Sequence, residues 1–315
     1  MPTSANDTMP SFDRLLVATD FSAASQAACR TAIDTCLALR ASLVILHVFR
    51  PPEAGDQAPD GQSPDSKALY DKCLDSLAEL RSQAVQAGVD CEAILGSGNP
   101  TAIILETIAA KKIDLAIMGT SALHGLERIV FDSTTEAVLR KAPCPVLTVG
   151  PHAMSSEKAL QSVGPVIFAT DFHFTTIHAM RFAACFSQLT ASPLHCLHVM
   201  PRTLEACTQC QVVPSIMSEA LQQLANESGL VVGAPICATT YGCEVSCGVV
   251  DYAREQKAKL IVLGVRKASL EASETHLHIA YRIITEAPCP VLTMAFASQP
   301  DVAIETVRRK APAMV

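Results

Sequence analysis

Short apolar runs alternate along the chain with longer segments of helical periodicity. In the first half, the apolar runs predict strands over 15–18, 43–48, 91–95, 115–118 and 146–149. The segments between them predict helices over 22–40, 66–86, 100–111 and 133–141. Because the runs do not alternate with polar residues, they are typical of strands buried on both faces of a parallel sheet. This succession of strands and helices predicts a doubly wound α/β fold.

The second half of the sequence repeats the first. Ala-Thr-Asp-Phe occurs at 18–21 and at 169–172, and Leu-His-Val occurs at 46–48 and at 197–199, both with an offset of 151 residues. Ala-Pro-Cys-Pro-Val-Leu-Thr occurs at 142–148 and at 287–293, with an offset of 145 residues. Three ordered matches indicate a duplicated domain.

The duplication predicts one domain over 12–150, a second over 164–297 and a tail over 298–315. Apolar runs predict the strands of the second copy over 166–169, 194–199, 236–241, 260–263 and 291–294. The change of offset predicts that the second copy is six residues shorter, in the loop after its second strand.

Composition supports two compact domains and excludes several classes of partner. The chain has 315 residues, of which 49% are hydrophobic and 17% charged, enough for two cores and unlike a disordered protein. A net charge of −7 without a basic stripe disfavours nucleic acid as a partner. No apolar run approaches the ~18 residues that would span a bilayer.

The amino-terminal residues and the cysteines indicate the cellular compartment of the protein. The first ten residues lack the basic and apolar regions of a signal peptide. Thirteen cysteines, an odd number spread singly through the predicted elements, fit a reducing compartment. We therefore predict a cytoplasmic location, with no membrane partner.

Together these patterns resemble the universal stress protein (UspA-like) family, in a tandem two-domain form. The resemblance rests on Ala-Thr-Asp-Phe after the first strand, Leu-His-Val in the second, Asp-Leu-Ala-Ile-Met-Gly-Thr at 114–120 and the Ala-Pro-Cys-Pro motif before the last. It implies a five-stranded parallel sheet of the Rossmann-like, adenine nucleotide alpha hydrolase-like class. In one branch of the family, ATP binds in a cleft through a G-x2-G-x9-G-(S/T) motif. Other members lack these glycines and do not bind ATP.

The motif maps onto the first half with its spacing intact but with two glycines replaced. Gly119 stands at the first position, Ala122 at the second, and Asp132 with Ser133 at the third. Glycine permits positive φ and close approach of a phosphate, so Ala122 weakens the match. The Asp132 carboxylate would repel a phosphate unless a metal such as Mg²⁺ intervened; alternatively Asp132 or Ser133 caps the next helix.

The resemblance implies a further set of contacts around the same cleft. Asp20, directly after the first strand, either accepts hydrogen bonds from ribose or adenine or caps the following helix. Val48 either contacts the base through its backbone or is an ordinary buried valine. The predicted cofactor-binding residues are Thr19, Asp20, Val48, Met118, Gly119, Ala122, Gly125, Asp132, Ser133 and Thr134, with ATP, accompanied by Mg²⁺ if Asp132 takes part, as the cofactor.

The second copy keeps only the first glycine of the motif. Gly264 is followed by Lys267 and Leu277 at the other glycine positions and by His278 at the Ser position. Leu277 would fill the phosphate space, although Arg266 and Lys267 could still hold an anion. The sequence favours a structural, degenerate second domain.

Other candidate sites have weaker support. The Cys-x-x-Cys at 207–210 falls in a predicted loop rather than at a helix start, so neither a redox pair nor a zinc site is favoured. Glu274, His276 and His278 lack a further metal ligand at standard spacing and are expected on a solvated loop. Cys144 and Cys289 are expected to be buried and inert. No catalytic residue or metal site is predicted, and a slow ATPase ranks last.

Two hypotheses of function follow. The first is a stress-response binding and regulatory protein with a weakened adenine-nucleotide site in the first domain; the alternative is a scaffold that acts through protein partners. In the resembling family, the last strands of two domains pair. We therefore expect strands 146–149 and 291–294 to pair within this chain as a pseudo-dimer, with further homo-oligomers left open.

Overall fold

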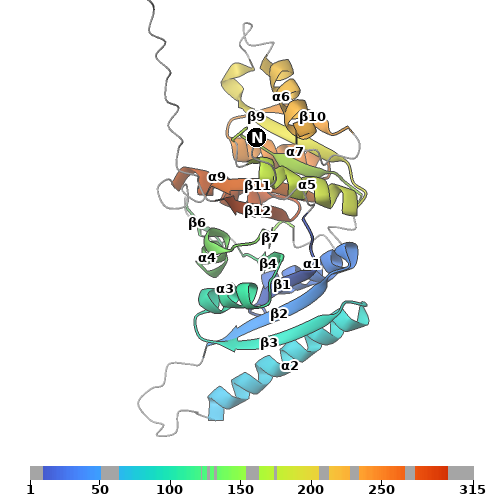
Figure 1. Cartoon of the computed structure of the whole chain (residues 1–315). Helices are drawn as coiled ribbons and strands as arrows, with labels where there is room; N and C mark the ends of the chain where they lie inside the picture. Colours follow the sequence, from blue (N-terminus) through green and yellow to red (C-terminus); the bar gives the residue numbers. More distant parts are fainter. Residues whose placement is uncertain are drawn as a thin grey trace, which may run out of the picture.

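One continuous mixed sheet runs through the whole molecule (Figure 1). The computed structural model describes residues 10–50, 64–121, 123–125, 128–130, 133–153, 163–173, 176–205, 213–227, 234–266 and 274–296. Within them, ten strands form one sheet in the order β10-β9-β8-β11-β12-β7-β4-β1-β2-β3. Five parallel strands come from each half of the chain, and the halves meet between β12 and β7.

The first half follows the predicted order of elements. Its strands and helices are β1 (Arg14–Thr19), α1 (Ala23–Leu39), β2 (Ser42–Phe49), α2 (Pro64–Gln86), β3 (Cys91–Ser97), α3 (Pro100–Ala110), β4 (Leu115–Gly119), α4 (Ser133–Lys141) and β7 (Val146–Val149). Pro100 occupies the first turn of α3, after the N-cap Asn99. A short antiparallel hairpin, β5 (Leu123–Gly125) and β6 (Arg128–Val130), lies between β4 and α4 and was not predicted.

The second half repeats this order with one difference in length. Its elements are β8 (Val166–Ala169), α5 (Thr176–Leu189), β9 (Leu194–Pro201), the 3-10 turn η1 (Arg202–Leu204), α6 (Val213–Glu227), β10 (Ile236–Gly242), α7 (Val245–Glu255), β11 (Leu260–Arg266), α9 (Glu274–Glu286) and β12 (Val291–Phe296). Helix α6 has 15 residues where α2 has 23. The change of offset therefore falls between β9 and β10, after the second strand as predicted.

Two details of the second half correct the sequence prediction. Strand β11 does not end near 263 but continues through Arg266, whose backbone is level with Phe296 of β12. Leu277 and His278 were expected on a loop, but they belong to α9, as do Glu274 and His276. The longer ladder with β12 extends the strand past the predicted boundary.

Two apolar layers explain why the strands lack polar alternation. Leu15 and Val17 of β1 pack on the face covered by α1, in a core that continues to α2, α5 and α6. Leu16, between them, packs on the opposite face, in a core with residues of α3, α4, α7 and α9. Because both faces are covered, both sets of side chains are buried.

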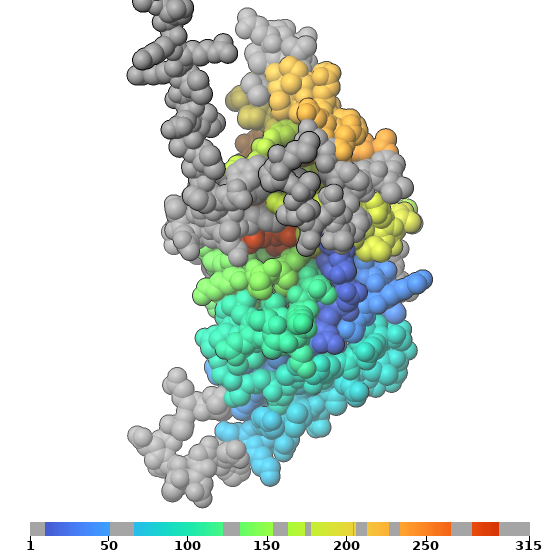
Figure 2. Space-filling view, in the orientation of Figure 1, coloured from blue at the N-terminus to red at the C-terminus, as the bar shows by residue number. Residues whose placement is uncertain are grey.

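The junction between the halves is an antiparallel strand pair, as predicted. Leu147 of β7 lies opposite Leu292 of β12, and both are fully buried. The Thr293 hydroxyl donates a hydrogen bond to the Val146 carbonyl at 3.2 Å. Figure 2 shows the consequence for the surface, with residues of the first half gathered at one end of the molecule and those of the second half at the other.

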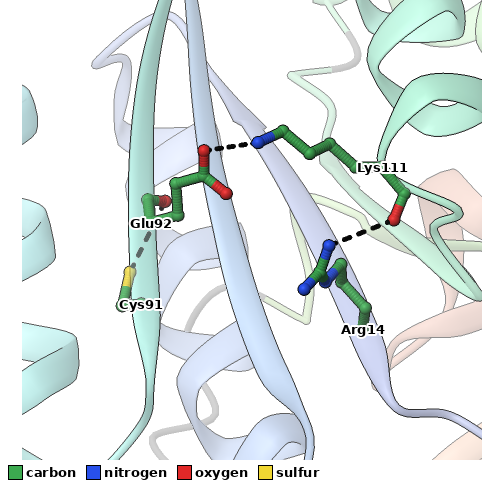
Figure 3. A network of polar contacts seen from close by, with 4 residues as sticks. All are labelled: Arg14, Cys91, Glu92 and Lys111. Atoms are coloured by element: carbon green, nitrogen blue, oxygen red, sulfur yellow. Dashed lines mark hydrogen bonds and ion pairs between the residues drawn. The ribbon is translucent and has the colours of Figure 1, made fainter.

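A small polar network ties together the amino ends of the first-half strands (Figure 3). Lys111, which caps α3, forms an ion pair of 2.5 Å with Glu92 of β3. Arg14 of β1 donates a hydrogen bond to the Lys111 carbonyl at 3.4 Å. This network lies at the sheet edge opposite the predicted cleft. In the described part of the chain, no helix has the length and apolar character needed to cross a membrane.

Candidate functional site

The turn after β1 holds Thr19 and Asp20 through local hydrogen bonds. The buried Thr19 hydroxyl accepts a hydrogen bond from the Phe21 amide at 3.0 Å and donates one to the Ser25 hydroxyl at 3.0 Å. The exposed Asp20 carboxylate accepts a hydrogen bond from the Ser22 amide at 3.0 Å. The Thr19 side chain is therefore committed to the turn, whereas Asp20 keeps further acceptor positions.

The predicted alternative role of Asp20 as a helix cap is wrong. Ser22 is the N-cap of α1, and its hydroxyl accepts a hydrogen bond from the Ser25 amide. Partial burial raises the pKa of Asp20, but hydrogen bonds from Ser22 and Ser25 outweigh it, so the net pKa lies below its ordinary value. The carboxylate is thus held ionised at neutral pH.

The repeated motifs of the sequence build one hydrogen-bonded corner, which occurs twice. In the first half, His47 Nδ1 lies 2.7 Å from the Thr19 carbonyl, and its ring lies 4.4 Å from that of Phe21, between centroids. In the second half, His198 Nδ1 lies 2.9 Å from the Thr170 carbonyl. Because a carbonyl only accepts, Nδ1 carries the proton in both rings.

The same corner imposes a left-handed backbone on a phenylalanine. Phe21 has a φ of 63° and Phe172 a φ of 61°, a region that non-glycine residues rarely adopt. In both copies the threonine hydroxyl accepts the amide hydrogen of that phenylalanine, at 3.0 Å. Asp171 accepts a hydrogen bond from the His173 amide, as Asp20 does from Ser22. A structural role therefore accounts for the retention of Asp171 without a ligand.

The carboxyl ends of β1 and β4 lie next to each other in the sheet of the first half. Strand β1 pairs with β2 on one side and with β4 on the other, so the sheet order reverses at β1. Val17 lies level with Ile117, which brings the strand ends Thr19 and Gly119 to the same edge. In open α/β sheets, ligands bind in the crevice at such a switch point.

Gly119 is required by the packing of helix α1. A Cβ atom added at Gly119 would lie 2.3 Å from the Ala24 carbonyl oxygen, which no side chain tolerates. The backbone of β4 therefore approaches the start of α1 closely. This contact explains the first glycine of the motif without a phosphate, so the glycine by itself is weak evidence for a nucleotide.

Thr120, beside the candidate site, was not among the predicted residues. It follows Gly119, is only 1% exposed, and its hydroxyl finds no hydrogen-bond partner in the described part of the chain. A buried hydroxyl without a partner costs about 1–3 kcal/mol. The motif treats Thr120 as a spacer, but the second copy has Val265 in its place, and that polar-to-apolar change is the signal that could have identified it.

The start of α4 is fixed against the end of β4. The Thr135 hydroxyl donates a hydrogen bond to the Gly119 carbonyl at 3.2 Å. Ser133 and Thr134 form the first turn of the same helix, whose amide groups favour anions. The predicted residues Ser133 and Thr134 are thereby brought to the same edge as Gly119.

The structure describes some of the remaining predicted site residues and not others. Met118 is buried in β4, and Val48 is half-buried near the end of β2. Gly125 ends β5 and pairs with Arg128 in the hairpin. Ala122 and Asp132, the two substituted glycine positions, lie outside the described residues. So do Lys267, the Cys-x-x-Cys at 207–210 and the predicted tail 298–315.

The second half contains a cavity of about 250 Å³ at the corresponding sheet edge. It lies beyond the ends of β8, β9 and β11 and is bounded by α7 and α9. Its lining residues are Ala169, Thr170, Asp171, Leu197, His198, Val199, Val245, Val249, Leu263, Gly264, Val265, Ile279, Ala280 and Ile283. The sequence favours a structural second domain, with an anion held by Arg266 and Lys267 as the alternative, and an open volume at this position was not predicted.

Cysteines and metal ligands give no further site. All eleven described cysteines are free thiols. Desolvation raises the pKa of Cys144 to about 11 and that of Cys289 to about 12, so both are unreactive. Over the same part of the chain, no group of three or more His, Cys, Asp or Glu residues could hold a metal ion.

Comparisons with known proteins match both halves. A sequence model described as the universal stress protein family matches residues 11–150 and 163–294. A universal stress protein of Methanocaldococcus jannaschii is 31% identical over 139 residues, which are 44% of this chain and 82% of that protein. One of Thermus aquaticus is 32% identical over 142 residues, which are 44% of this chain and 98% of that protein. The crystal structure of a universal stress protein from Archaeoglobus fulgidus has a TM-score of 0.69 at 18% identity, covering 90% of this chain and 98% of that one.

Proposed function

Because the chain belongs to the universal stress protein family, we propose that it is a binding and regulatory protein of the stress response whose first cleft takes an adenine nucleotide weakly. The observation that carries the proposal is the buried Thr120 hydroxyl, which has no protein partner among the described residues. A ligand group at the ends of β1 and β4 would satisfy that hydroxyl. Its replacement by Val265 in the second copy limits the proposal to the first.

The residues around this crevice suit a nucleotide in part. Asp20 is an ionised acceptor with capacity for a ribose hydroxyl or an adenine amine. The first turn of α4, with Ser133 and Thr134, suits an anionic phosphate. Ala122 and Asp132 replace two glycines of the family motif, and the carboxylate of Asp132 would oppose a phosphate unless Mg²⁺ joined it. The fit therefore supports weak binding rather than tight binding.

We infer binding rather than catalysis. The described cleft supplies acceptors and a helix terminus, which hold a ligand, but we identify no group that would position a water or take its proton. Bound nucleotide would stabilise the first domain by mass action. A change of ligand concentration would thereby change the stability of the protein or the surface that it presents to protein partners.

Calorimetric titration of the full chain with ATP and Mg²⁺ tests the proposal. We expect a saturable heat, and about a tenfold loss of affinity in Thr120→Val, because the variant removes a hydroxyl that a ligand would pair. Without ligand the same variant should be as stable as the wild type or up to about 1–3 kcal/mol more stable, since it removes a buried unpaired group. Chemical denaturation measures that second effect.

The second candidate function, a scaffold without nucleotide, is favoured by the packing explanation for Gly119. The same titration distinguishes the two candidate functions. If no heat is observed at millimolar ATP, only the scaffold function remains. Ala122→Gly and Asp132→Gly should tighten binding if the cleft is merely weakened. Unchanged heats in both variants would contradict that explanation of weakness.

A further inference from the structure

The cavity of the second half is lined mainly by aliphatic side chains. Its floor is formed by Ala169, Leu197 and Val199, near the ends of β8 and β9, and its walls come from α7, β11 and α9. Its volume of about 250 Å³ exceeds the ~150 Å³ of an apolar cavity that accepts benzene. A cavity of this size and lining accepts one small apolar molecule.

The residues that line the second cavity differ in polarity from their first-half counterparts only on the side formed by β11 and α9. The floor is the same in both, with Ala18, Leu46 and Val48 in the first half at the positions of Ala169, Leu197 and Val199. The differences lie at the end of β4 and the start of α4 in the first half, and at the end of β11 and the start of α9 in the second half. Thr120, Thr134 and Thr135 of the first half become Val265, Ile279 and Ala280 in the second.

These three replacements remove from the second cavity the hydroxyl groups that could meet a phosphate. In the first half, Thr120 and Thr134 carry hydroxyl groups near the helix start that suits an anion, and the Thr135 hydroxyl donates to the Gly119 carbonyl. In the second half, an anion at the same place would meet aliphatic carbon and lose its hydration without compensation. An apolar group would instead be stabilised there in proportion to the area it buries.

Thr170, Asp171 and His198 are the polar residues among those that line the cavity, and the acidic one, Asp171, determines which charge the ligand can carry. Asp171 lines the cavity and is exposed, with its carboxylate already accepting one hydrogen bond from the His173 amide. An ionised carboxylate accepts several hydrogen bonds, so it can also accept one from a hydroxyl or amine. It repels a carboxylate at short range, which disfavours fatty acids and other anions.

We propose that the cavity of the second half binds a small neutral aromatic molecule that carries one hydrogen-bond donor, a simple phenol or aromatic amine, and that it does not bind a nucleotide. The ring lies among Leu197, Val249 and Ile283, and its donor points toward Asp171. This site is separate from the nucleotide cleft proposed for the first half. The two halves of the chain therefore bind ligands of different chemical classes.

Titration of the full-length protein with p-cresol tests the proposal. Binding is followed by calorimetry and by methyl NMR of isoleucine, leucine and valine labels. We expect a saturable heat and shifts confined to the methyl groups of the cavity, including those of Ile279 and Ile283. p-Toluate, which has the same ring with a carboxylate, should bind at least tenfold more weakly.

Two variants narrow the cavity, and one matched variant does not. Ala280→Leu should lower the affinity for p-cresol at least tenfold, because the added carbons occupy the space of the ring. Ala280→Gly weakens the helix without narrowing the cavity and should retain binding. Val245→Phe, at a lining position that is 45% exposed, should also block the ligand and serves if Ala280→Leu does not fold.

Three outcomes would overturn the proposal: no heat with p-cresol, unchanged affinity in both narrowing variants, or equal binding of p-toluate. Competition of ATP with p-cresol for the same methyl groups would also overturn it, because it would assign a nucleotide to the second cavity. None of these results touches the first cleft, whose test uses Thr120→Val.

Discussion

Asp20, which was predicted to contact a ligand, has a structural role in the turn after β1. Its oxygen accepts the Ser22 amide, and the hydroxyls of Ser22 and Ser25 help to hold it ionised. The corresponding Asp171 makes the same kind of bond to His173 in the second half. The family motif alone does not separate these two roles, because the residue is present in either case.

Replacement of Asp20 by asparagine should reveal this structural contribution through its pH dependence. The folded pKa lies below the ordinary value of 3.8, so the carboxylate stabilises the fold above pH 3.8, and that contribution is lost as pH falls below the folded pKa. We expect Asp20→Asn to be less stable than wild type at pH 7, by less than about 1 kcal/mol for an exposed charge. Urea denaturation at pH 7, 5 and 3 should show the difference shrinking at pH 3. A difference that is constant with pH would contradict the assignment.

Gly119→Ala should destabilise the protein whether or not nucleotide is present. The added methyl would lie 2.3 Å from the Ala24 carbonyl oxygen, and overpacking of this kind costs about 1–3 kcal/mol or more. Denaturation midpoints with and without ATP measure the effect. If the variant were as stable as wild type and only lost ligand binding, the glycine would be needed for the ligand instead of for α1.

At the scale of single residues, the sequence predicted where residues lie better than it predicted the physical reason for each residue. Gly119, Met118 and the first turn of α4 lie at the predicted edge of the sheet. The close approach of α1 to Gly119 depends on tertiary packing that no local pattern encodes. Thr120 was missed because a spacing motif ignores the residues between its fixed positions, and its burial becomes visible only once the layers are assembled.

At the scale of elements, the recurring unit is the corner that joins the first strand to the second. Thr19, Phe21 and His47 form it in one half, and Thr170, Phe172 and His198 form it in the other. The imidazole ties the end of the second strand to the carbonyl at the end of the first. The Leu-His-Val repeat is thus explained by its histidine, which the sequence analysis did not assign to any role.

His47→Phe and His198→Phe should each lower the free energy of unfolding by about 1 kcal/mol, the net value of one hydrogen bond. Phenylalanine keeps a ring beside the corner phenylalanine but cannot donate to the carbonyl. Urea denaturation followed by far-ultraviolet circular dichroism measures both variants. Since the two corners share their geometry, a loss in one variant only would show that the bonds are not equivalent.

Elements with long apolar runs were predictable, and short or charged ones were not. Each predicted strand is present, because burial on both faces leaves a continuous apolar signature. The hairpin of Leu123–Gly125 and Arg128–Val130 has strands too short to show any period. The predicted strand ended at Leu263 because Gly264 was assigned to the motif loop, yet the ladder with β12 extends to Arg266.

At the scale of the whole molecule, β7 and β12 make the two halves one sheet. Leu147 and Leu292 face each other at its centre, and Tyr281 of α9 lies close to Arg140 of α4 beside it. Burial raises the pKa of the Tyr281 hydroxyl well above its ordinary value, so it stays protonated. The resemblance to the family implied this pairing of the two last strands, and the structure confirms it.

Leu147→Asp should loosen both halves. The variant places a carboxylate at a fully buried position, which costs several kcal/mol, and it would weaken the pairing between β7 and β12. Hydrogen exchange should show lower protection in both strands, whereas Leu147→Met, which conserves volume, should keep protection in both. Loss of protection restricted to the first half would mean that the junction does not couple the two.

The covalent union of the two halves has a consequence for how the protein can change. In a symmetric pair of identical chains, every substitution appears twice, so both clefts must remain alike. Here the paired strands come from separate stretches of one polypeptide, and a mutation alters one cleft while its counterpart stays intact. The three threonines of the first cleft can therefore correspond to valine, isoleucine and alanine in the second cleft, with no change in the first. One polypeptide can thereby hold two clefts whose linings change independently while they share one sheet.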